Sequence, residues 1–147
     1  MSLYRSAIRS ERGAALVEMA MTLPLLMLIS VGIVEFGRAY QTWQVLTNAA
    51  REGARVAVLP GVNDEAVTGR VQDYLEAGKI TDPDSAIVVI DRNNVVAIGA
   101  TNASASSVKV DYPFQFMVLQ PIAQLVANGS NLGGPLTMSA SATMRNE

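Results

Sequence analysis

One long apolar run near the start of the chain dominates its pattern of hydrophobic and polar residues. The run extends over 23 residues from Ala14 to Phe36, and its only ionisable side chains are Glu18 and Glu35. A helix that crosses a hydrocarbon core of about 30 Å needs about 20 mostly apolar residues, since each residue adds about 1.5 Å. The run therefore predicts a transmembrane helix over residues 14–36. The stretches after it are too polar to follow it into the membrane.

The periodicity beyond the run predicts that the same helix continues outside the membrane, over residues 37–59. Apolar residues recur there every three or four positions, as on one face of an amphipathic helix. The members of this stripe are Phe36, Tyr40, Trp43, Leu46, Ala50, Ala54 and Ala57. Pro60 and Gly61 then end the helix. One helix over residues 14–59 would have 46 residues and a length of about 69 Å.

Several side chains in this helix suit particular depths. Pro24 removes a backbone hydrogen bond in the middle of the apolar run and predicts a kink or a locally opened helix, although membrane helices also tolerate proline. Glu35 lies near the outer interface and faces Arg38, three residues on. Tyr40 and Trp43 suit the membrane interface, where a ring with a polar edge is stable. Packing of the two rings against the following domain explains them equally well, so both interpretations stay open.

Residues 60–147 predict a small α+β domain. Asn63 and Asp64 cap a helix with a buried stripe of Val67, Val71, Tyr74 and Leu75, and the helix ends at Gly78. The later pattern predicts short strands, because β-branched or alternating apolar residues stand between turn residues. The expected elements are a buried strand over 86–90, a turn over 91–94, a hairpin partner over 95–98, a mobile loop over 99–106, a half-buried strand over 107–112, a short helix over 121–128 and a strand over 136–145.

The leader over residues 1–13 predicts the orientation of the chain. Arg5, Arg9 and Arg12 against Glu11 give it a net side-chain charge of +2. Basic residues before a span stay in the cytoplasm, so the domain after the span should lie outside. A secretory signal peptide would have an apolar core of only about 7–15 residues and a small-residue cleavage site after it, which this run lacks. An uncleaved signal anchor and a leader that is cut after Gly13 both fit.

Glu18 favours the cut leader. A carboxylate within a bilayer costs about 2.5–3.5 kcal/mol on insertion scales and usually marks a functional partner. Glu18 could reach the cytoplasmic interface, or it could pair with a free α-amine at Ala14 that a cut after Gly13 creates. An anion near the positive end of a helix is also favourable. After such a cut, Glu18 is the fifth residue of the mature chain.

These motifs together resemble the TadE-like minor pseudopilins of tight-adherence (Tad) pilus systems. The motifs are Arg12 with Gly13, Glu18, the run Leu23–Leu26 and the run Glu35–Arg38. The resemblance is dense from Arg12 to about Leu59 and recurs over 139–147. It implies that a prepilin peptidase cuts after Gly13, and that Glu18 recruits the subunit by pairing with the N-terminal amine of a neighbouring subunit. It also implies a pilin-like fold, with an antiparallel sheet packed on residues 37–59.

The resemblance further implies the partners and the location of the protein. The partners would be other minor pseudopilins and the major pilin of the same pilus, the prepilin peptidase, inner-membrane platform proteins and membrane lipid. The protein would span the bacterial cytoplasmic membrane once, with its N-terminus inside and its domain outside or in the extracellular pilus. Ala14 replaces the phenylalanine of many type IV pilins, and Met19 replaces the usual tyrosine of major Flp-type pilins. Both departures favour a minor component.

Composition offers few candidates for chemistry. The 147 residues include neither cysteine nor histidine, so disulfides are excluded and a zinc site would rest on carboxylates alone. Without the leader the net charge is near −4, which gives no basic surface for nucleic acid. Ser106 and Lys109 match the S-x-x-K pattern of serine β-lactamases, but that pattern needs a helix and these residues lie in a strand pattern. We therefore expect no catalytic residue, metal or cofactor.

Three functions compete on this basis. The first is a structural component of pilus assembly, which is the function we expect. The second is an unprocessed, signal-anchored module that binds a ligand or an adhesion target outside the membrane. The third is a membrane enzyme, for which the sequence offers no set of residues. Processing after Gly13 discriminates the first function from the second.

Overall fold

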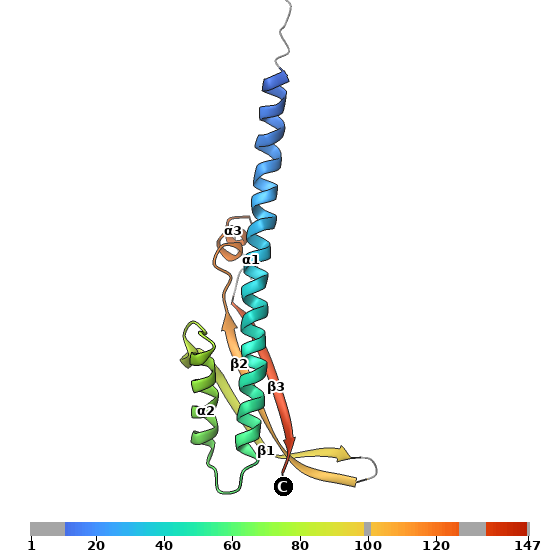
Figure 1. Cartoon of the computed structure of the whole chain (residues 1–147), viewed down its shortest axis with the longest axis vertical. Helices are drawn as coiled ribbons and strands as arrows, with labels where there is room; N and C mark the ends of the chain where they lie inside the picture. Colours follow the sequence, from blue (N-terminus) through green and yellow to red (C-terminus); the bar gives the residue numbers. More distant parts are fainter. Residues whose placement is uncertain (1–10, 99–100, 127–134, 147) are drawn as a thin grey trace, which may run out of the picture. The chain divides into compact units, whose positions relative to one another are not determined.

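The protein has an α+β fold with a long N-terminal helix and a small antiparallel sheet (Figure 1). The computed structural model describes residues 11–98, 101–126 and 135–146. The elements in chain order are α1 (Glu11–Ala57), α2 (Asp64–Ala77), the 3-10 turn η1 (Pro83–Ser85), β1 (Ile87–Ile98), β2 (Thr101–Phe114), α3 (Leu119–Val126) and β3 (Leu136–Arg145). The chain divides after Val34 into an N-terminal unit and a C-terminal unit that begins at Glu35.

The first helix, α1, has 47 residues and belongs to both units. The long helix predicted over 14–59 is therefore confirmed, with its end at Ala57. Pro24 lies inside the helix, and a kink there stays a prediction. In the N-terminal unit, every side chain over residues 14–30 is exposed. Among the described residues, this is the one helix that is long and apolar enough to cross a membrane.

In the C-terminal unit, α1 buries a face of mostly small side chains. The buried apolar residues of this face are Ala39, Leu46, Ala49, Ala50, Ala54 and Ala57. The predicted stripe is thus confirmed in its later members but wrong at Phe36, Tyr40 and Trp43, which are exposed. The buried face begins at Glu35 and Ala39, one position before Phe36 and Tyr40. One position turns a side chain by about 100° around the helix axis, because a turn holds about 3.6 residues.

Strand β2 is the centre of a three-stranded antiparallel sheet in the order β1-β2-β3. Its Val108, Val110 and Tyr112 are buried in the core, and the alternation predicted over 107–112 is confirmed. The strand predicted over 136–145 is confirmed as β3, with Ala140 buried. The sheet and α1 share one hydrophobic core with α2, whose cap at Asn63 accepts a hydrogen bond from the Ala66 N–H at 3.0 Å.

The predicted hairpin turn over 91–94 is wrong. Residues 87–91 and 94–98 belong to one strand, β1, and both halves pair with β2 across a register shift between Asp91 and Asn94. Such a bulge leaves backbone groups out of the ladder, and here side chains bind two of them. The Asp91 carboxylate accepts from the Asn93 N–H at 2.9 Å, and the Asn94 amide oxygen accepts from the Val95 N–H at 2.8 Å. These turn-forming residues therefore bend a strand without reversing it.

The loop predicted over 99–106 and the burial of the strand predicted over 86–90 also need correction. Strand β2 already begins at Thr101, and residues 99–100 lie outside the described part of the chain. Ala105 and Ser106 are buried, so their small size reflects close packing and not mobility. Ile87 and Val89 are exposed, because β1 has one face on the core and one face away from it.

Gly53 on α1 provides a test of this packing. We expect Gly53→Ala to lower the free energy of unfolding by a net amount of about 1–2 kcal/mol. The added carbon would lie 2.6 Å from Val71 Cγ2 and 3.2 Å from Val108 Cγ1, and both valines are fully buried. The resulting overpacking outweighs the gain of about 1 kcal/mol that alanine brings to a helix.

The matched control is Gly69→Ala on α2, where no atom lies within 4 Å of the added carbon. We expect this change to stabilise the protein by about 0.5–1 kcal/mol. Denaturant titration of the full chain in detergent micelles measures both effects. Stabilisation by both substitutions would contradict the close approach at Gly53.

An ion cluster between α1 and α2 makes stability depend on acid pH. Hydrogen bonds from Arg55 and Arg70 lower the pKa of Glu52 from its ordinary 4.5 to about 2. A lowered pKa stabilises the fold above pH 4.5, and this contribution is lost as the pH falls through about 2. Solvent screens the cluster, so we expect at most about 1 kcal/mol.

Glu52→Gln should therefore reduce the loss of stability between pH 4.5 and pH 2. Glu65→Gln on α2 is the control, because Glu65 is exposed and lies in no ion pair of the described residues. Unfolding midpoints measured across this range give the result. Parallel pH curves for the wild type and Glu52→Gln would contradict it.

Candidate functional site

The residues around the predicted cut lie in the first described part of α1. Gly13 and Ala14 are helical, and both are exposed. Glycine costs a helix about 1 kcal/mol relative to alanine, so Gly13 weakens the helix beside the bond that would be cut. Cleavage at this bond stays a prediction.

Glu18 lies on an apolar, exposed surface of the N-terminal unit. Val17, Met19 and Met21 beside it are exposed as well. Its backbone oxygen accepts from the Thr22 hydroxyl at 3.0 Å, but no described residue forms a hydrogen bond or an ion pair with its carboxylate. A carboxylate in such surroundings is costly in lipid. Pairing of Glu18 with another molecule stays a prediction.

Glu35 has very different surroundings, since its side chain is buried with only 3% of the residue exposed. One carboxylate oxygen, Oε1, accepts from the N–H groups of Met117 and Val118, both at 3.0 Å. The other, Oε2, accepts from the Met117 N–H at 3.1 Å and from Arg38 Nη1 at 3.3 Å. The predicted approach of Glu35 and Arg38 is thus confirmed. Because the two N–H groups directly precede α3, Glu35 binds the positive start of that helix.

Aromatic rings reinforce the same connection. The Phe116 ring lies edge-to-face with Phe36, at 5.8 Å between centroids, and with Phe114, at 5.2 Å. Such geometry is favourable beyond the area it buries. The Arg38 guanidinium lies 5.6 Å from the centroid of Phe114. We call the contacts of Glu35 and Arg38 with residues 114–118 the Glu35 clamp.

The Glu35 clamp was not predictable from the sequence. Its two key donors are backbone N–H groups, which every residue type except proline offers, and they lie more than 80 residues after Glu35. The sequence indicates only the local pair of Glu35 and Arg38. The structure thus gives Glu35 a second role, as the anchor of the segment before α3.

Tyr40 and Trp43 are exposed and contact each other, with ring centroids 6.3 Å apart. The Tyr40 hydroxyl accepts from Gln44 Nε2 at 2.7 Å. Tyr40 is 61% and Trp43 is 45% exposed, so packing accounts for only part of each side chain. Their position at a membrane interface stays a prediction.

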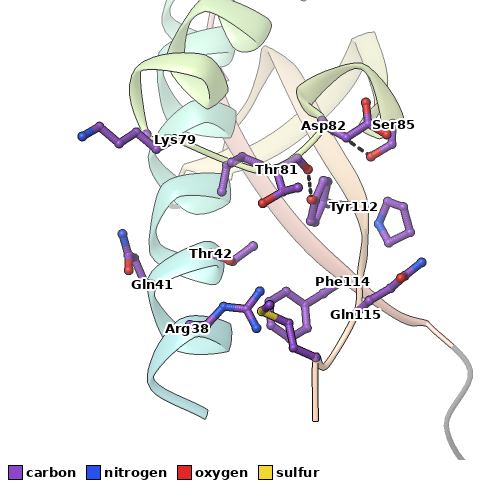
Figure 2. Close-up of a pocket in the computed structure, with 14 residues that line it drawn as sticks. Arg38, Gln41, Thr42, Lys79, Thr81, Asp82, Ser85, Tyr112, Phe114 and Gln115 are labelled. Carbon is purple, nitrogen blue, oxygen red and sulfur yellow. Dashed lines mark hydrogen bonds between the residues drawn. The ribbon is translucent and has the colours of Figure 1, made fainter. Parts of the chain in front are cut away.

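Beside the clamp lies an open cavity of about 470 Å³ (Figure 2). Its walls come from α1, from the segment between α2 and η1, and from the end of β2. Tyr112 donates a hydrogen bond to the Thr81 carbonyl oxygen across it, and burial raises the pKa of Tyr112, so its hydroxyl stays protonated. Within the described ranges, no group of three carboxylates could hold a metal ion.

The S-x-x-K residues are not brought together. Three positions apart in β2, Ser106 and Lys109 lie on opposite faces of the strand. The Ser106 hydroxyl donates to Asn146 Oδ1 at 2.7 Å, and Lys109 pairs with Asp111 at 2.7 Å. The two side chains are therefore each engaged in separate structural contacts.

Comparison with known proteins finds a similarity in the N-terminal part of the chain. Residues 13–55 match the model of the family described as TadE-like protein. No curated protein and no solved structure matches the chain. The matched range lies within α1 and includes Gly13, Glu18, Pro24 and Glu35. The resemblance indicated by the sequence motifs is thus confirmed over residues 13–55, where the chain is similar to the TadE-like protein family.

Proposed function

We propose that this protein is a minor pseudopilin of a tight-adherence pilus, held in the cytoplasmic membrane by residues 14–36 and cut by a prepilin peptidase after Gly13. The family match over residues 13–55 carries this proposal. Together with the apolar helix, it fits a pilus-associated, membrane-anchored protein. The exposure of the N-terminal unit supports it further, since its apolar side chains need lipid or neighbouring helices around them.

Glu18 would perform the recruiting step. A cut after Gly13 leaves a charged amine on Ala14, and the carboxylate of Glu18 on a neighbouring subunit then pairs with it. In an apolar environment such a pair forms a strong, charge-assisted contact, whereas each charge alone is costly. The lack of a partner for the Glu18 carboxylate among the described residues supports an intermolecular role.

The remaining partners follow from the same proposal. The exposed helix of the N-terminal unit would pack against other minor pseudopilins and the major pilin, and inner-membrane platform proteins would assist its insertion into the pilus. The C-terminal unit would lie outside the cytoplasmic membrane. We propose a structural role without an enzymatic step, cofactor or nucleic-acid partner.

The N-terminal residue and the intact mass of the protein from its native membrane test this proposal. An N-terminus at Ala14, with or without a methyl group on the amine, is the expected result. A chain that keeps Met1 in a strain with active prepilin peptidase would contradict the proposal. The better reading would then be a signal-anchored binding or adhesion module.

A further inference from the structure

We propose that the segment at the start of α3 lies in the outer lipid headgroup layer, with an apolar patch of the C-terminal unit immersed in lipid. The patch consists of Phe36, Met117, Val118 and Ile122, and we call it the interfacial patch. This inference rests on the membrane insertion of α1 in the proposed function. It adds a second lipid contact that the Glu35 clamp holds in place.

The interfacial patch is exposed and apolar. Phe36, Met117, Val118 and Ile122 are 64%, 69%, 42% and 41% exposed. Its members come from two places in the chain, and the clamp joins them through Glu35, next to Phe36, and the N–H groups of Met117 and Val118. No described residue covers this surface enough to bury it. Among the described residues, the patch therefore has no apolar cover.

The charge distribution favours lipid as that environment. Residues 112–144 contain no charged side chain in a stretch of 33 residues. Entry of this segment into the headgroup layer therefore removes no charged side chain of residues 112–144 from water. The one buried charge at the patch, on Glu35, pairs with Arg38 and accepts from two N–H groups that α3 cannot bind itself. The clamp thus satisfies the polar groups that lipid would leave without partners.

Chain continuity sets the depth of the patch. Residues 14–36 form about 34 Å of helix at 1.5 Å per residue, against a hydrocarbon core of about 30 Å and a bilayer of about 40–45 Å with its headgroups. Phe36 is the last residue of this run, and the clamp is centred on the residue before it. If the span places Phe36 in lipid, the rest of the patch lies beside it and contacts lipid as well. Lipid therefore covers the patch without any further binding partner.

Spin labels at single cysteines test the inference, because the natural chain has no cysteine. The full chain with Ile122→Cys is labelled and reconstituted at low density in phosphatidylcholine vesicles. The accessibility of the label to oxygen, which partitions into lipid, is compared with its accessibility to a water-soluble nickel chelate. Val89→Cys is the matched control, since Val89 is also an exposed apolar residue but lies on β1. Leu26→Cys reports on the span itself.

We expect the labels at Ile122→Cys and Leu26→Cys to be more accessible to oxygen than to the nickel chelate. The label at Val89→Cys should be more accessible to the nickel chelate than to oxygen. Adding Glu35→Ala to Ile122→Cys should shift the label toward nickel, because the segment loses its acceptor for Met117 and Val118. Adding Glu52→Ala should leave the label unchanged, since Glu52 binds Arg55 and Arg70 instead.

Three other results would overturn the inference. If the Ile122→Cys label is more accessible to the nickel chelate while the Leu26→Cys label is more accessible to oxygen, the span inserts but the patch stays in water. Poor access of both reagents to the Ile122→Cys label means that protein covers the patch. Nickel in excess at Leu26→Cys means that the span itself fails to insert, which contradicts the proposed function together with the patch.

Discussion

Gly13→Leu should leave the protein in the membrane as a single uncut species. A protease must reach an unwound backbone, and Gly13 lies in α1, next to the bond that would be cut. Leucine stabilises a helix by about 0.8–1 kcal/mol relative to glycine and places a bulky side chain beside the bond. Both effects oppose cleavage, whereas the apolar run that inserts into the membrane is unchanged. Mass spectrometry of the membrane fraction would detect the retained leader.

The matched control is Ala15→Leu, which adds similar bulk two positions further on, beyond the predicted cut. This variant should still be processed, with Ala14 as its first residue. Cleavage of the Gly13→Leu protein at the wild-type rate would remove Gly13 as the processing site. Loss of cleavage in both variants would indicate that general crowding of the helix start is responsible.

Glu18→Ala should insert and be cut normally but lose its association with pilin neighbours. Removal of a carboxylate lowers the cost of insertion by up to about 3 kcal/mol, so the anchor is not weakened. Loss of one member of a buried ion pair typically costs about 2–5 kcal/mol, or roughly a 30-fold fall in association even at the lower end. Co-purification with the other pilins, measured at equal membrane levels, gives the size of the loss.

Thr22→Ala is the control for this change. Thr22 lies one helical turn beyond Glu18, and its hydroxyl already binds the Glu18 carbonyl oxygen, so its removal takes no charge from the surface. We expect Thr22→Ala to associate normally. Wild-type pilus formation by Glu18→Ala would reject the pairing of Glu18 with an N-terminal amine.

The sequence predicts the long helix and the last strand well, because both have strong local patterns. The apolar run and Pro60 define α1 to within a few residues, and strict alternation defines β3 over Leu136–Arg145. The amide of Asn63 is an effective cap in any context, so the start of α2 is also correct. In each case the deciding interactions lie within a few residues of one another.

The errors arise where distant contacts override local preference. Asp91 and Asn94 favour a turn, but pairing with β2 on both sides turns them into a bulge. The small residues Ala105 and Ser106 indicate a loop in isolation and a tightly packed strand in the fold. The aromatic residues Tyr40 and Trp43 fit an apolar helix stripe, yet Glu35 and Ala39 occupy the buried face.

The Glu35 clamp also sets the order in which a growing chain can fold. Met117 follows Glu35 by 82 residues, so a nascent chain that has emerged only as far as α2 holds Glu35 with Arg38 as its nearest charge partner. During that interval the start of the C-terminal unit keeps a carboxylate whose two backbone donors have not yet been translated. Completion of the clamp therefore requires that residues 117 and 118 have been synthesised. A truncated chain that ends before them would leave the Glu35 carboxylate without these two backbone donors.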